Sequence, residues 1–485
     1  MQIDDCHYAA RAVVRGSAHR LMHDQTGWRD RRHFLMFCTA MTIQEQVARH
    51  LAAAFVCGRW QIEELVERGG DACEKGGRWL RPLVQRLMQA LGYTRRPSRW
   101  RVLKFLRQDP GLRRACVKHE LRPIGLQWRR PEMAPADGRP TTWQLPPLVT
   151  IGELADWLDL RAAELDWFAD ARHLERHVPE GPLRHYRYYW LSKRLGGSAR
   201  LVEAPKWRLK TIQRRILHEI LEHIPLHPAA HGFRAGRSIG SFVAPHAGQD
   251  VVLKVDLQDF FPTISKPRVT AIFRTAGYPE EVCQMLASLC TNWSPADVWQ
   301  QFPQYGDIRD RWRHESLYHR PHLPQGAPTS PAVANLCSYR LDCRLDGLAR
   351  SAGGHYTRYA DDLLFSGPET LAQSVRRFYA TVCTIVIEEG FQVHGRKTRI
   401  MRQGVRQSAA GLVFNQHANI ARGEYDRLKA ILYNCVRQGP AAQNRDGRAD
   451  FRAHLEGRVG FVESIHPARG RRLRLLFERI AWPAD

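Results

Sequence analysis

The sequence has no apolar run that reaches the roughly 18 residues needed to cross a bilayer. Residues 1–20 carry Asp4, Asp5, Arg11 and Arg15 and lack an uninterrupted apolar core, so they do not resemble an export signal. These two absences favour a cytoplasmic protein.

Cysteine pairs with the spacing of metal ligands are also absent. The chain has 11 cysteines without a Cys-x-x-Cys pair, and the closest spacings, Cys283 to Cys290 and Cys337 to Cys343, match no zinc pattern. We expect reduced and mostly buried thiols, and a structural metal is the less favoured alternative.

Acidic residues are too few to balance the basic ones. Lysine and arginine number 73 against 49 aspartates and glutamates, which gives a formal net charge of +24 and a pI near 10.0. A field of this sign concentrates polyanions, so nucleic acid is favoured as the partner over an acidic protein or an anionic lipid. The length of 485 residues and the hydrophobic content of 44% predict several folded domains.

A stretch rich in proline and glycine, residues 130–147, interrupts helix and strand periodicity and predicts a domain boundary. Upstream, Thr42 and Glu45 form a capping-box pattern before apolar residues at helical spacing, which predicts a mainly helical first region. Two basic and aromatic clusters there, residues 78–81 and 99–101, would either bind nucleic acid or combine core tryptophans with solvated arginines.

After the boundary, the pattern changes from helices to strands and back. Residues 151–172 predict two short helices, and residues 187–191 and 200–202 predict two strands on either side of a Gly-Gly turn. Residues 206–224 predict a helix with one apolar face and strongly basic exposed sides.

Acidic residues in two separate segments indicate the chemistry. Asp256 lies near the end of an aliphatic and β-branched run, residues 251–257, which predicts a strand buried on both faces. Residues 355–365 predict two strands joined by a tight turn that holds Asp361 and Asp362. Adjacent acids between apolar strands repel each other unless cations are present, whereas acids on an exposed turn would be solvated. We interpret Asp256 together with Asp361 and Asp362 as a paired Mg²⁺ site for phosphoryl transfer in a nucleotide-polymerising enzyme.

The segments beside these acids predict a nucleotide pocket. Residues 323–331 form a rigid turn that opens a helix expected to run to about Leu348. Exposed backbone at Gly326 would let a flat ligand approach closely, so Gln325 and Gly326 are candidates for positioning the incoming nucleotide and the template base.

The residues that follow Asp256 are further candidates. Phe261 would form the wall on the sugar side of the pocket, and the backbone near Asp259 would approach the triphosphate. Core packing of Phe260 or Phe261 fits the spacing at least as well.

The ordered series of motifs resembles motifs A, B and C of reverse transcriptases, in particular those of the bacterial retron type. Its parts are Asp256 with Phe260-Phe261, then Gln325-Gly326-Ala327-Pro328-Thr329-Ser330-Pro331, then Tyr359-Ala360-Asp361-Asp362. The resemblance covers roughly residues 183–480. It includes a fingers motif at residues 230–238, motif D at 390–398 and the primer-grip motif E at 411–415.

This resemblance implies a role for each matching residue. It implies that Asp256, Leu257, Asp361 and Asp362 hold two Mg²⁺ ions, and that Lys397 protonates the leaving pyrophosphate. It places Phe261 at the steric gate that excludes a ribose 2′-hydroxyl. The other implied nucleotide contacts are Arg200, Asp259, Phe260, Gln325 and Gly326, and the implied nucleic-acid contacts are Arg237, Gly411 and Leu412. An ordinary phosphate contact for Lys397 and a salt bridge within the fingers for Arg200 remain alternatives.

The fold implied by the resemblance is an α+β right-hand polymerase with fingers, a palm that contains an antiparallel sheet, and a helical thumb. Its expected partners are an RNA template, an RNA/DNA duplex and deoxynucleoside triphosphates, with a dedicated non-coding RNA as a further candidate. The expected regions are a basic helical N-terminal region with its linker (1–147), a helical module and fingers (148–250), a palm with an insertion at about 285–320 (251–405), and a primer grip and thumb (406–485).

Two elements depart from the retron pattern. Where retron enzymes carry Asn-Ala-x-x-His, this chain has Phe242-Val243-Ala244-Pro245-His246, and where they carry Val-Thr-Gly it has Ala409-Ala410-Gly411. Both elements accompany recognition of the retron RNA, so the RNA partner and branched priming stay open.

The sequence thus predicts an RNA-directed DNA polymerase that acts in antiviral defence. The alternative is an RNA-binding component of a bacterial defence complex in which DNA synthesis is secondary. An RNA-templated RNA polymerase fits Tyr359-Ala360-Asp361-Asp362 and Phe261 poorly.

Overall fold

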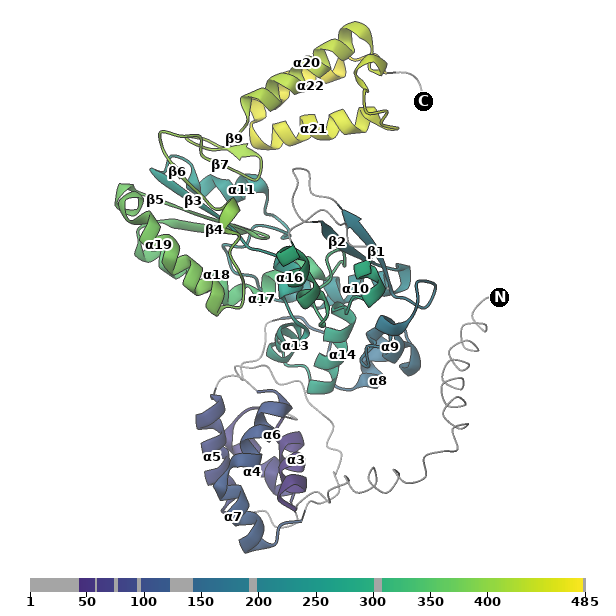
Figure 1. The fold of residues 1–485 in the computed structure, drawn as a ribbon, viewed down its shortest axis with the longest axis vertical. Helices are drawn as coiled ribbons and strands as arrows, with labels where there is room; N and C mark the ends of the chain where they lie inside the picture. Colours follow the sequence, from purple (N-terminus) through teal and green to yellow (C-terminus); the bar gives the residue numbers. More distant parts are fainter. Residues whose placement is uncertain are drawn as a thin grey trace. The chain divides into compact units, whose positions relative to one another are not determined.

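The computed structural model describes residues 43–56, 59–73, 77–93, 97–122, 143–191, 199–300 and 308–482, apart from the side chains of 308–310. These residues form two compact units, a helical N-terminal unit that ends before residue 129 and a larger unit that contains residues 143–482 (Figure 1). Thr42, most of the expected linker and the turn at 192–198 lie outside the described residues.

Each helix of the N-terminal unit buries part of its surface. The helices are α3 (Ile43–Val56), α4 (Ile62–Asp71), α5 (Leu80–Leu91), α6 (Arg99–Gln108) and α7 (Pro110–His119). Leu51 and Leu87 are fully buried, in line with the helical spacing of the apolar residues. Asp109 caps α7, because its carboxylate accepts a hydrogen bond from the backbone N–H of Leu112 while also binding Arg86. The mainly helical character predicted for this region is confirmed.

The larger unit is organised around a four-stranded antiparallel sheet with the strand order β4-β5-β3-β6. Its strands are β3 (Val251–Asp256), β4 (His355–Tyr359), β5 (Asp362–Gly367) and β6 (Arg399–Arg402). Both edges of β3 are hydrogen-bonded, to β5 on one side and to β6 on the other. This internal position explains why the sequence of β3 is almost entirely aliphatic.

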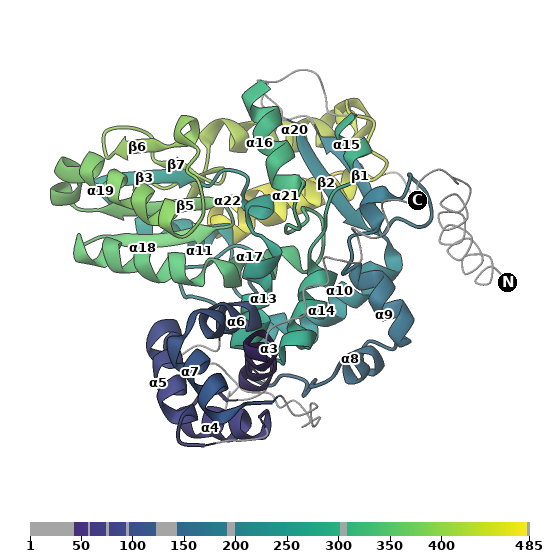
Figure 2. The same ribbon diagram turned by 60° about the horizontal axis from the view of Figure 1, so that its bottom comes forward.

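Alternate side chains of the sheet enter two different cores. Val251 packs into the core formed with α18 (Tyr339–Ser351) and α19 (Glu369–Glu388), which lie beside the sheet in Figure 2. Val252 packs into the core shared with the C-terminal helices. Because side chains alternate between faces with a period of two, Asp256 lies on the same face as Val252, away from α18 and α19.

A two-stranded sheet and its helices come before β3 in the chain. The elements are α8 (Ile151–Trp157), α9 (Ala162–Ala169), β1 (Tyr186–Leu191), β2 (Arg200–Pro205) and α10 (Trp207–Glu219). The two short helices and the strand pair agree with the sequence prediction. The helix expected to reach residue 224 ends at Glu219, because Ile220 has φ −123° and ψ −62° and a separate 3₁₀ turn follows.

Helices occupy most of the stretch between β3 and β4. They are α12 (Phe260–Thr263), α13 (Lys266–Thr275), α14 (Glu280–Cys290), α15 (Ala296–Gln300), α16 (Ile308–Tyr318) and α17 (Ser330–Cys337). The predicted single helix through Leu348 is wrong, because α17 ends at Cys337 and Ser338 takes φ −90° and ψ 0° before α18 begins. Ser338 is fully buried and donates its hydroxyl to the carbonyl of Ala334, an interaction that often bends a helix.

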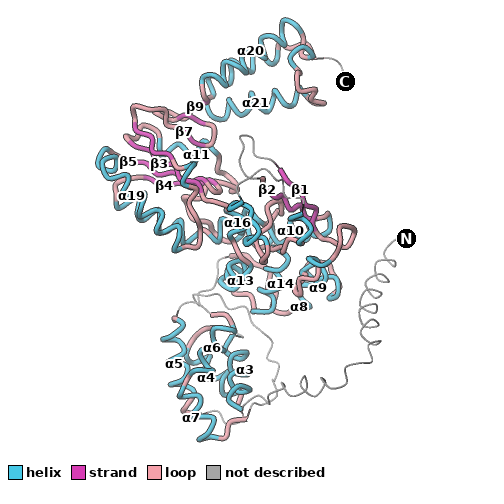
Figure 3. Tube along the Cα trace, in the orientation of Figure 1, coloured by secondary structure: helices cyan, strands magenta, loops and turns pink. Residues whose placement is uncertain are grey.

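The C-terminal part joins a small sheet to a helical bundle. Its elements are β7 (Ser408–Ala409), β8 (Leu412–Val413), β9 (Asn419–Ile420), α20 (Arg422–Gln438), α21 (Phe451–Ile465) and α22 (Pro467–Glu478). Figure 3 shows the short strands in magenta beside the cyan C-terminal helices. Leu428, Leu432 and Cys435 of the predicted apolar stripe are buried in α20.

Short elements complete the described chain. They are η2 (Glu175–His177), η3 (Leu221–His223), α11 (Ile239–Val243), η4 (Ala244–His246), η5 (Gly395–Lys397) and η6 (Ala441–Gln443). Within the described ranges, no helix is long and apolar enough to traverse a lipid bilayer. Cysteines in these ranges are free thiols, and Cys73, Cys283, Cys290 and Cys435 among them are buried. The predicted α+β class, with antiparallel sheets and many helices, is confirmed.

Candidate active site at the end of the central sheet

β3 and β5 bring the predicted acids to one end of the sheet. Asp256, the last residue of β3, pairs in register with Asp362, the first residue of β5. Asp361 precedes Asp362 in the turn from β4, and its carbonyl accepts a hydrogen bond of 2.8 Å from the backbone N–H of Leu257. Three aspartates and Leu257, which lie in two segments far apart in the sequence, are therefore neighbours.

The backbone of Gly232 packs directly against the turn that carries Asp361. Ala360 has φ 55°, a left-handed conformation that is uncommon outside glycine. A Cβ atom added to Gly232 would lie 2.6 Å from the backbone nitrogen of Ala360, so only glycine permits this approach. The carbonyl of Gly232 is also held, by a 2.9 Å hydrogen bond from the side chain of Asn335.

A fully buried arginine supports the same turn from the α18 side of the sheet. Arg358 forms two hydrogen bonds, of 2.8 and 2.7 Å, with the two carboxylate oxygens of Asp342 in α18. It also donates to Asn335 at 2.9 Å and to the carbonyl of Ala360 at 3.3 Å. Bidentate pairing fixes the guanidinium plane, and the guanidinium in turn fixes the backbone just before Asp361.

Burial and mutual repulsion shape the electrostatics of the acids. Burial raises the pKa of Asp361, and the charges of Asp256 and Asp362 raise it further. Burial also raises the pKa of Asp362, while the Lys254 ammonium opposes that rise. Positive charge at this end of the sheet therefore stabilises the ionised carboxylates.

Lysine side chains supply part of that positive charge. Lys397 Nζ lies 3.0 and 2.9 Å from the two carboxylate oxygens of Asp256, and Lys254 Nζ lies 3.0 Å from Oδ1 of Asp362. In the described part of the chain, no three carboxylate, imidazole or thiol groups are gathered in ready-made ligand geometry. The donors themselves fit Mg²⁺, because carboxylate oxygens are the hard ligands that it prefers.

Asp259 is placed differently from the other acids. Its φ is 47°, and its carboxylate accepts hydrogen bonds from Arg313 Nε at 2.8 Å and His314 Nε2 at 3.1 Å, both on α16. Burial alone would raise the pKa of Asp259, but the hydrogen bonds and charges of His314 and Arg313 outweigh it and lower the pKa to about 2. The predicted insertion therefore contacts the segment expected to approach the triphosphate.

The two adjacent phenylalanines have different surroundings. Phe260 is buried and stacks on Phe391 with ring centroids 5.6 Å apart, so the core-packing alternative describes it well. Phe261 is half-buried, and its ring centroid lies 6.2 Å from that of the exposed Phe233. Phe261 is thus the phenylalanine that remains accessible beside the acids.

The turn that contains Gln325 and Gly326 docks against β2. The backbone N–H of Glu203 donates to the carbonyl of Gln325 at 2.8 Å. Gly326 has φ 134°, and a Cβ atom there would lie 2.8 Å from the carbonyl oxygen of Glu203. A side chain at position 326 would push the turn away from β2, which explains the glycine.

The Glu203 side chain forms a buried ion pair behind that turn. It is fully buried and accepts hydrogen bonds from Asn292 Nδ2 and Ser294 Oγ, each at 2.8 Å, and from His322 Nε2 at 2.9 Å. His322 Nδ1 lies 2.8 Å from the carbonyl oxygen of Arg320. Because both ring nitrogens face acceptors, the geometry calls for an imidazolium beside a carboxylate. Burial would raise the pKa of Glu203, but His322 and the other donors outweigh it and lower the pKa.

The remaining predicted residues are placed by their own elements. Among the described contacts, none joins Arg200, Arg237, Gly411 or Leu412 to the three aspartates. Arg200 is exposed at the first position of β2, and Arg237 is exposed before α11. Gly411 lines a groove of about 560 Å³ together with residues of α20 and α21.

Comparison with known proteins identifies the family. The family model described as "Reverse transcriptase (RNA-dependent DNA polymerase)" matches residues 192–419. The chain is 42% identical over 306 residues to the retron Mx65 reverse transcriptase of Myxococcus xanthus, a match that covers 62% of this chain and 66% of that protein. It is 37% identical to the retron Mx162 reverse transcriptase of the same organism, over 66% of this chain and 64% of that protein. It is 30% identical to the retron Ec86 reverse transcriptase of Escherichia coli, over 59% of this chain and 79% of that protein.

The chain belongs to the retron-type reverse transcriptases. It spans slightly under two thirds of the length of the two Myxococcus xanthus relatives. The resemblance to the retron type inferred from the motifs is confirmed.

His246, the residue of the retron Asn-Ala-x-x-His element that this chain keeps, is held by hydrogen bonds in the core. His246 is fully buried, with Nδ1 2.7 Å from Ser366 Oγ and Nε2 2.8 Å from Thr357 Oγ1. Thr357 donates its hydroxyl to the carbonyl of Phe242, so Nε2 must carry the proton and Nδ1 accepts from Ser366. Burial lowers the pKa of His246 to about 3. The neutral ring thus joins η4 to β4 and β5.

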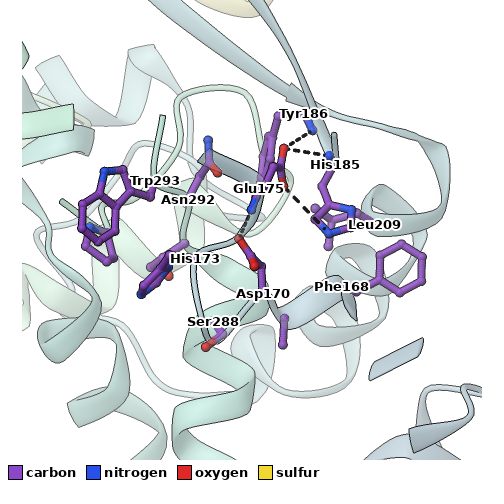
Figure 4. Close-up of a pocket in the computed structure, with 13 residues that line it drawn as sticks. Phe168, Asp170, His173, Glu175, His185, Tyr186, Leu209, Ser288, Asn292 and Trp293 are labelled. Atoms are coloured by element: carbon purple, nitrogen blue, oxygen red, sulfur yellow. Dashed lines mark hydrogen bonds and ion pairs between the residues drawn. The ribbon is translucent and has the colours of Figure 1, made fainter. Parts of the chain in front are cut away.

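A small buried cavity of about 20 Å³ lies elsewhere in this unit (Figure 4). Its volume suits about one water molecule. Burial raises the pKa of Glu175 to about 8, although Oε1 accepts backbone hydrogen bonds from His185 at 2.7 Å and Tyr186 at 3.3 Å. The cavity is lined by none of the predicted site residues, so it is separate from the candidate active site.

Sequence reasoning missed the residues that support the site. Lys254 and Arg358 contact the acids or their turn, Asp342 holds Arg358, and Glu203 with His322 supports the Gln325 turn. One signal in the sequence was a charged residue within a strand that is otherwise largely buried, as Lys254 is in β3 and Arg358 is in β4.

Proposed function

We propose that this chain is an RNA-directed DNA polymerase that extends a primer on an RNA template with deoxynucleotides. The proposal rests on one observation. Asp256 of β3 pairs with Asp362 of β5 on the neighbouring strand, and Asp361 is adjacent to Asp362 in the turn. Three carboxylates at one end of a rigid sheet suit a pair of divalent ions. Membership in the retron-type reverse transcriptases supports RNA as the template.

In this proposal Asp256, Asp361 and Asp362 hold two Mg²⁺ ions, with Leu257 beside them. Bound there, the ions would activate the primer 3′-hydroxyl and neutralise the charge of the phosphates and leaving group. Lys254 and Lys397 keep the acids ionised while substrate is absent, through the ion pairs already formed. Lys397, whose ammonium pairs with Asp256 in this structure, would serve as the proton donor to the leaving pyrophosphate.

The other side chains shape the nucleotide pocket. Phe261 forms the wall on the sugar side, and the backbone at Asp259 and Phe260 faces the triphosphate together with Arg200. Gln325 and Gly326 position the nucleotide and template base. Gly411, Leu412 and Arg237 contact the nucleic acid along the groove towards α20 and α21.

The decisive experiment replaces the turn acids. We expect Asp361→Ala/Asp362→Ala to abolish incorporation of deoxynucleotides into a primed RNA template in Mg²⁺, while RNA binding persists, because the acids act only on the reacting phosphates. The measurement is primer extension on a gel, with RNA affinity measured in parallel.

The matched control is Glu63→Ala/Glu64→Ala, which removes two adjacent acids of α4 with side chains 74% and 41% exposed. It should extend primers like the wild type. Continued synthesis by the Asp361 and Asp362 variant would remove these residues from the metal site.

A second candidate function is an RNA-binding component of a defence complex in which synthesis is secondary. The net charge of +24 and the two altered retron elements favour it. It predicts that the inactive Asp361 and Asp362 variant keeps full biological effect in cells that carry the system. Loss of that effect would favour the polymerase.

A further inference from the structure

The exposed charged side chains of α6 and α7 in the N-terminal unit are all basic. The basic residues of α6 and α7 are Arg99, Arg101, Lys104, Arg107, Arg113, Arg114 and Lys118. The one carboxylate between residues 99 and 119, Asp109, is buried and paired with Arg86. On α4, in contrast, Glu63, Glu67 and Asp71 are exposed. A merely solvated surface mixes both signs, as α3 does where Glu45 pairs with Arg49, so the single sign of the exposed charges on α6 and α7 indicates an anionic partner.

An exposed tryptophan accompanies the basic residues of α6. Trp100 is 63% exposed, and Lys104 Nζ lies 5.3 Å from the centroid of its ring. Residues four positions apart share one face of a helix, so Trp100 and Lys104 are neighbours there, while Arg107, one turn further on, is paired with Glu45 of α3. The indole therefore offers a flat apolar surface inside a positively charged one.

The next helix, α7, also exposes basic residues. Arg113, Arg114 and Lys118 are exposed, whereas Leu112 and Ala115 of the same helix are buried. Asp109 is the only residue between α6 and α7, and its contacts with Arg86 hold the junction in place. We call Trp100, Lys104 and these three α7 residues the α6–α7 surface.

The chemistry of this surface selects its partner. Lysine and arginine at helical spacing bind phosphate groups, and an exposed indole stacks on the face of a base. Bases in a duplex are stacked on each other and hide their faces, whereas unpaired bases are available. A single strand of RNA therefore uses both properties of the surface, while an acidic protein would use only the charge.

We propose that the α6–α7 surface is a binding site for single-stranded RNA, additional to the groove lined by Gly411, α20 and α21. It holds an unpaired part of the RNA partner through phosphate contacts and one base stacked on Trp100. This site goes beyond the proposed polymerase function, because adding nucleotides to a short primed template does not require it.

The test uses the full-length protein and three variants. Arg113→Ala/Arg114→Ala and Trp100→Ala alter the surface, and Arg376→Ala/Arg377→Ala removes a matched pair of adjacent, exposed arginines from α19. The probe is a fluorescein-labelled single-stranded RNA of mixed sequence, measured by anisotropy with excess unlabelled primed template to occupy the polymerase groove. A labelled RNA hairpin duplex is measured in the same way.

We expect Arg113→Ala/Arg114→Ala to weaken binding of the single strand several-fold relative to the α19 control. The slope of log affinity against log salt should become shallower by about 1.4, because each phosphate contact on a single strand contributes about 0.7. Trp100→Ala should weaken the single strand by about fivefold or more, because stacking on one base is worth about 1–3 kcal/mol, and it should leave the duplex unchanged.

Two results would overturn the proposal. One is binding of the single strand by Arg113→Ala/Arg114→Ala within twofold of the α19 control. The other is cross-linking of 4-thiouridine-labelled RNA that maps only to residues after 143. Primer extension on a short template separates this test from that of the proposed function, because all three variants should extend such a primer at the wild-type rate.

Discussion

At the residue scale, lysine side chains govern the charge of the acidic turn. Lys254 and Lys397 contact Asp362 and Asp256, and they compensate like charges that would otherwise repel across two adjacent strands. Removal of Lys397 should therefore affect both the leaving group and the affinity of the acids for metal.

We expect Lys397→Met to lower the turnover rate of primer extension by about 10²-fold or more, because a positioned general acid contributes about that factor. At the same time, the Mg²⁺ concentration for half-maximal rate should fall, because the ammonium no longer competes for Asp256. Rates measured across a Mg²⁺ titration test both effects. An unchanged half-maximal concentration would show that the ion pair does not compete with metal.

Phe261 is the accessible phenylalanine of the pair, and its substitution tests the steric gate. Phe261→Ala should raise incorporation of ribonucleotides relative to deoxynucleotides by about tenfold or more, because the space for the 2′-hydroxyl opens. The ratio of kcat/KM for matched ribo- and deoxynucleotides is the measurement. Phe260→Leu, a change to a buried residue, is the control and should keep the wild-type ratio.

Residue identities in the motifs could be read from the sequence, but their supporting partners could not. Asp361 and Asp362 stand in one short local pattern, so their placement in a turn was predictable. Arg358 pairs with Asp342 on a helix that packs against β4, and Glu203 pairs with His322 across a long sequence separation. Such pairs depend on how elements pack, which local periodicity does not encode.

At the element scale, β2 and the Gln325 turn are joined by the buried pair of Glu203 and His322. Glu203→Ala should lower stability by about 3–5 kcal/mol, because it leaves a buried charge and two donors without their acceptor. The measurement is the temperature at which heated protein loses half of its primer-extension activity. That midpoint should fall by several degrees.

Glu63→Ala provides the comparison for this prediction. It removes an exposed ion pair with Arg81, in which the two charged groups are 3.6 Å apart. Surface pairs of this kind contribute about 0–1 kcal/mol, so the midpoint should barely change. Equal effects of the two substitutions would contradict a special role for the buried pair.

Element boundaries show where sequence patterns stop being informative. The apolar periodicity around α17 and α18 is continuous enough to predict one helix, but a buried serine hydroxyl bonded within the chain interrupts it at Ser338. Ile220 ends α10 before the predicted end although it is itself buried and apolar. In both places tertiary packing determines the backbone conformation, and a pattern of apolar residues cannot report it.

At the scale of the whole molecule, the net charge of +24 predicts that nucleic acid accompanies the protein during purification. We expect sequencing of the co-purified nucleic acid to find one enriched RNA with DNA attached, and the Asp361→Ala/Asp362→Ala variant to carry the same RNA without DNA. Free complementary DNA without linked RNA would indicate a priming reaction different from that of retrons. RNA without DNA in both proteins would favour the binding-component function.

The two compact units differ in how much the sequence could reveal. Motifs in the larger unit lie on a polymerase framework, so their order predicted its fold. The N-terminal unit has helical periodicity and charge but no motif of known chemistry, and its role had to be inferred from the exposure of its side chains. If both units bind the same RNA, as proposed, RNA binding by the full chain should fall with rising salt more steeply than binding by the Arg113→Ala/Arg114→Ala variant.

The contact between Gly232 and Ala360 has a practical meaning for anyone who wishes to engineer this protein. Libraries that randomise position 232 would consist almost entirely of dead clones, since even an alanine methyl group would collide with the peptide that carries the reactive turn. Variation is better directed at Phe233, its exposed neighbour, whose ring lies beside those of Phe261 and Tyr359.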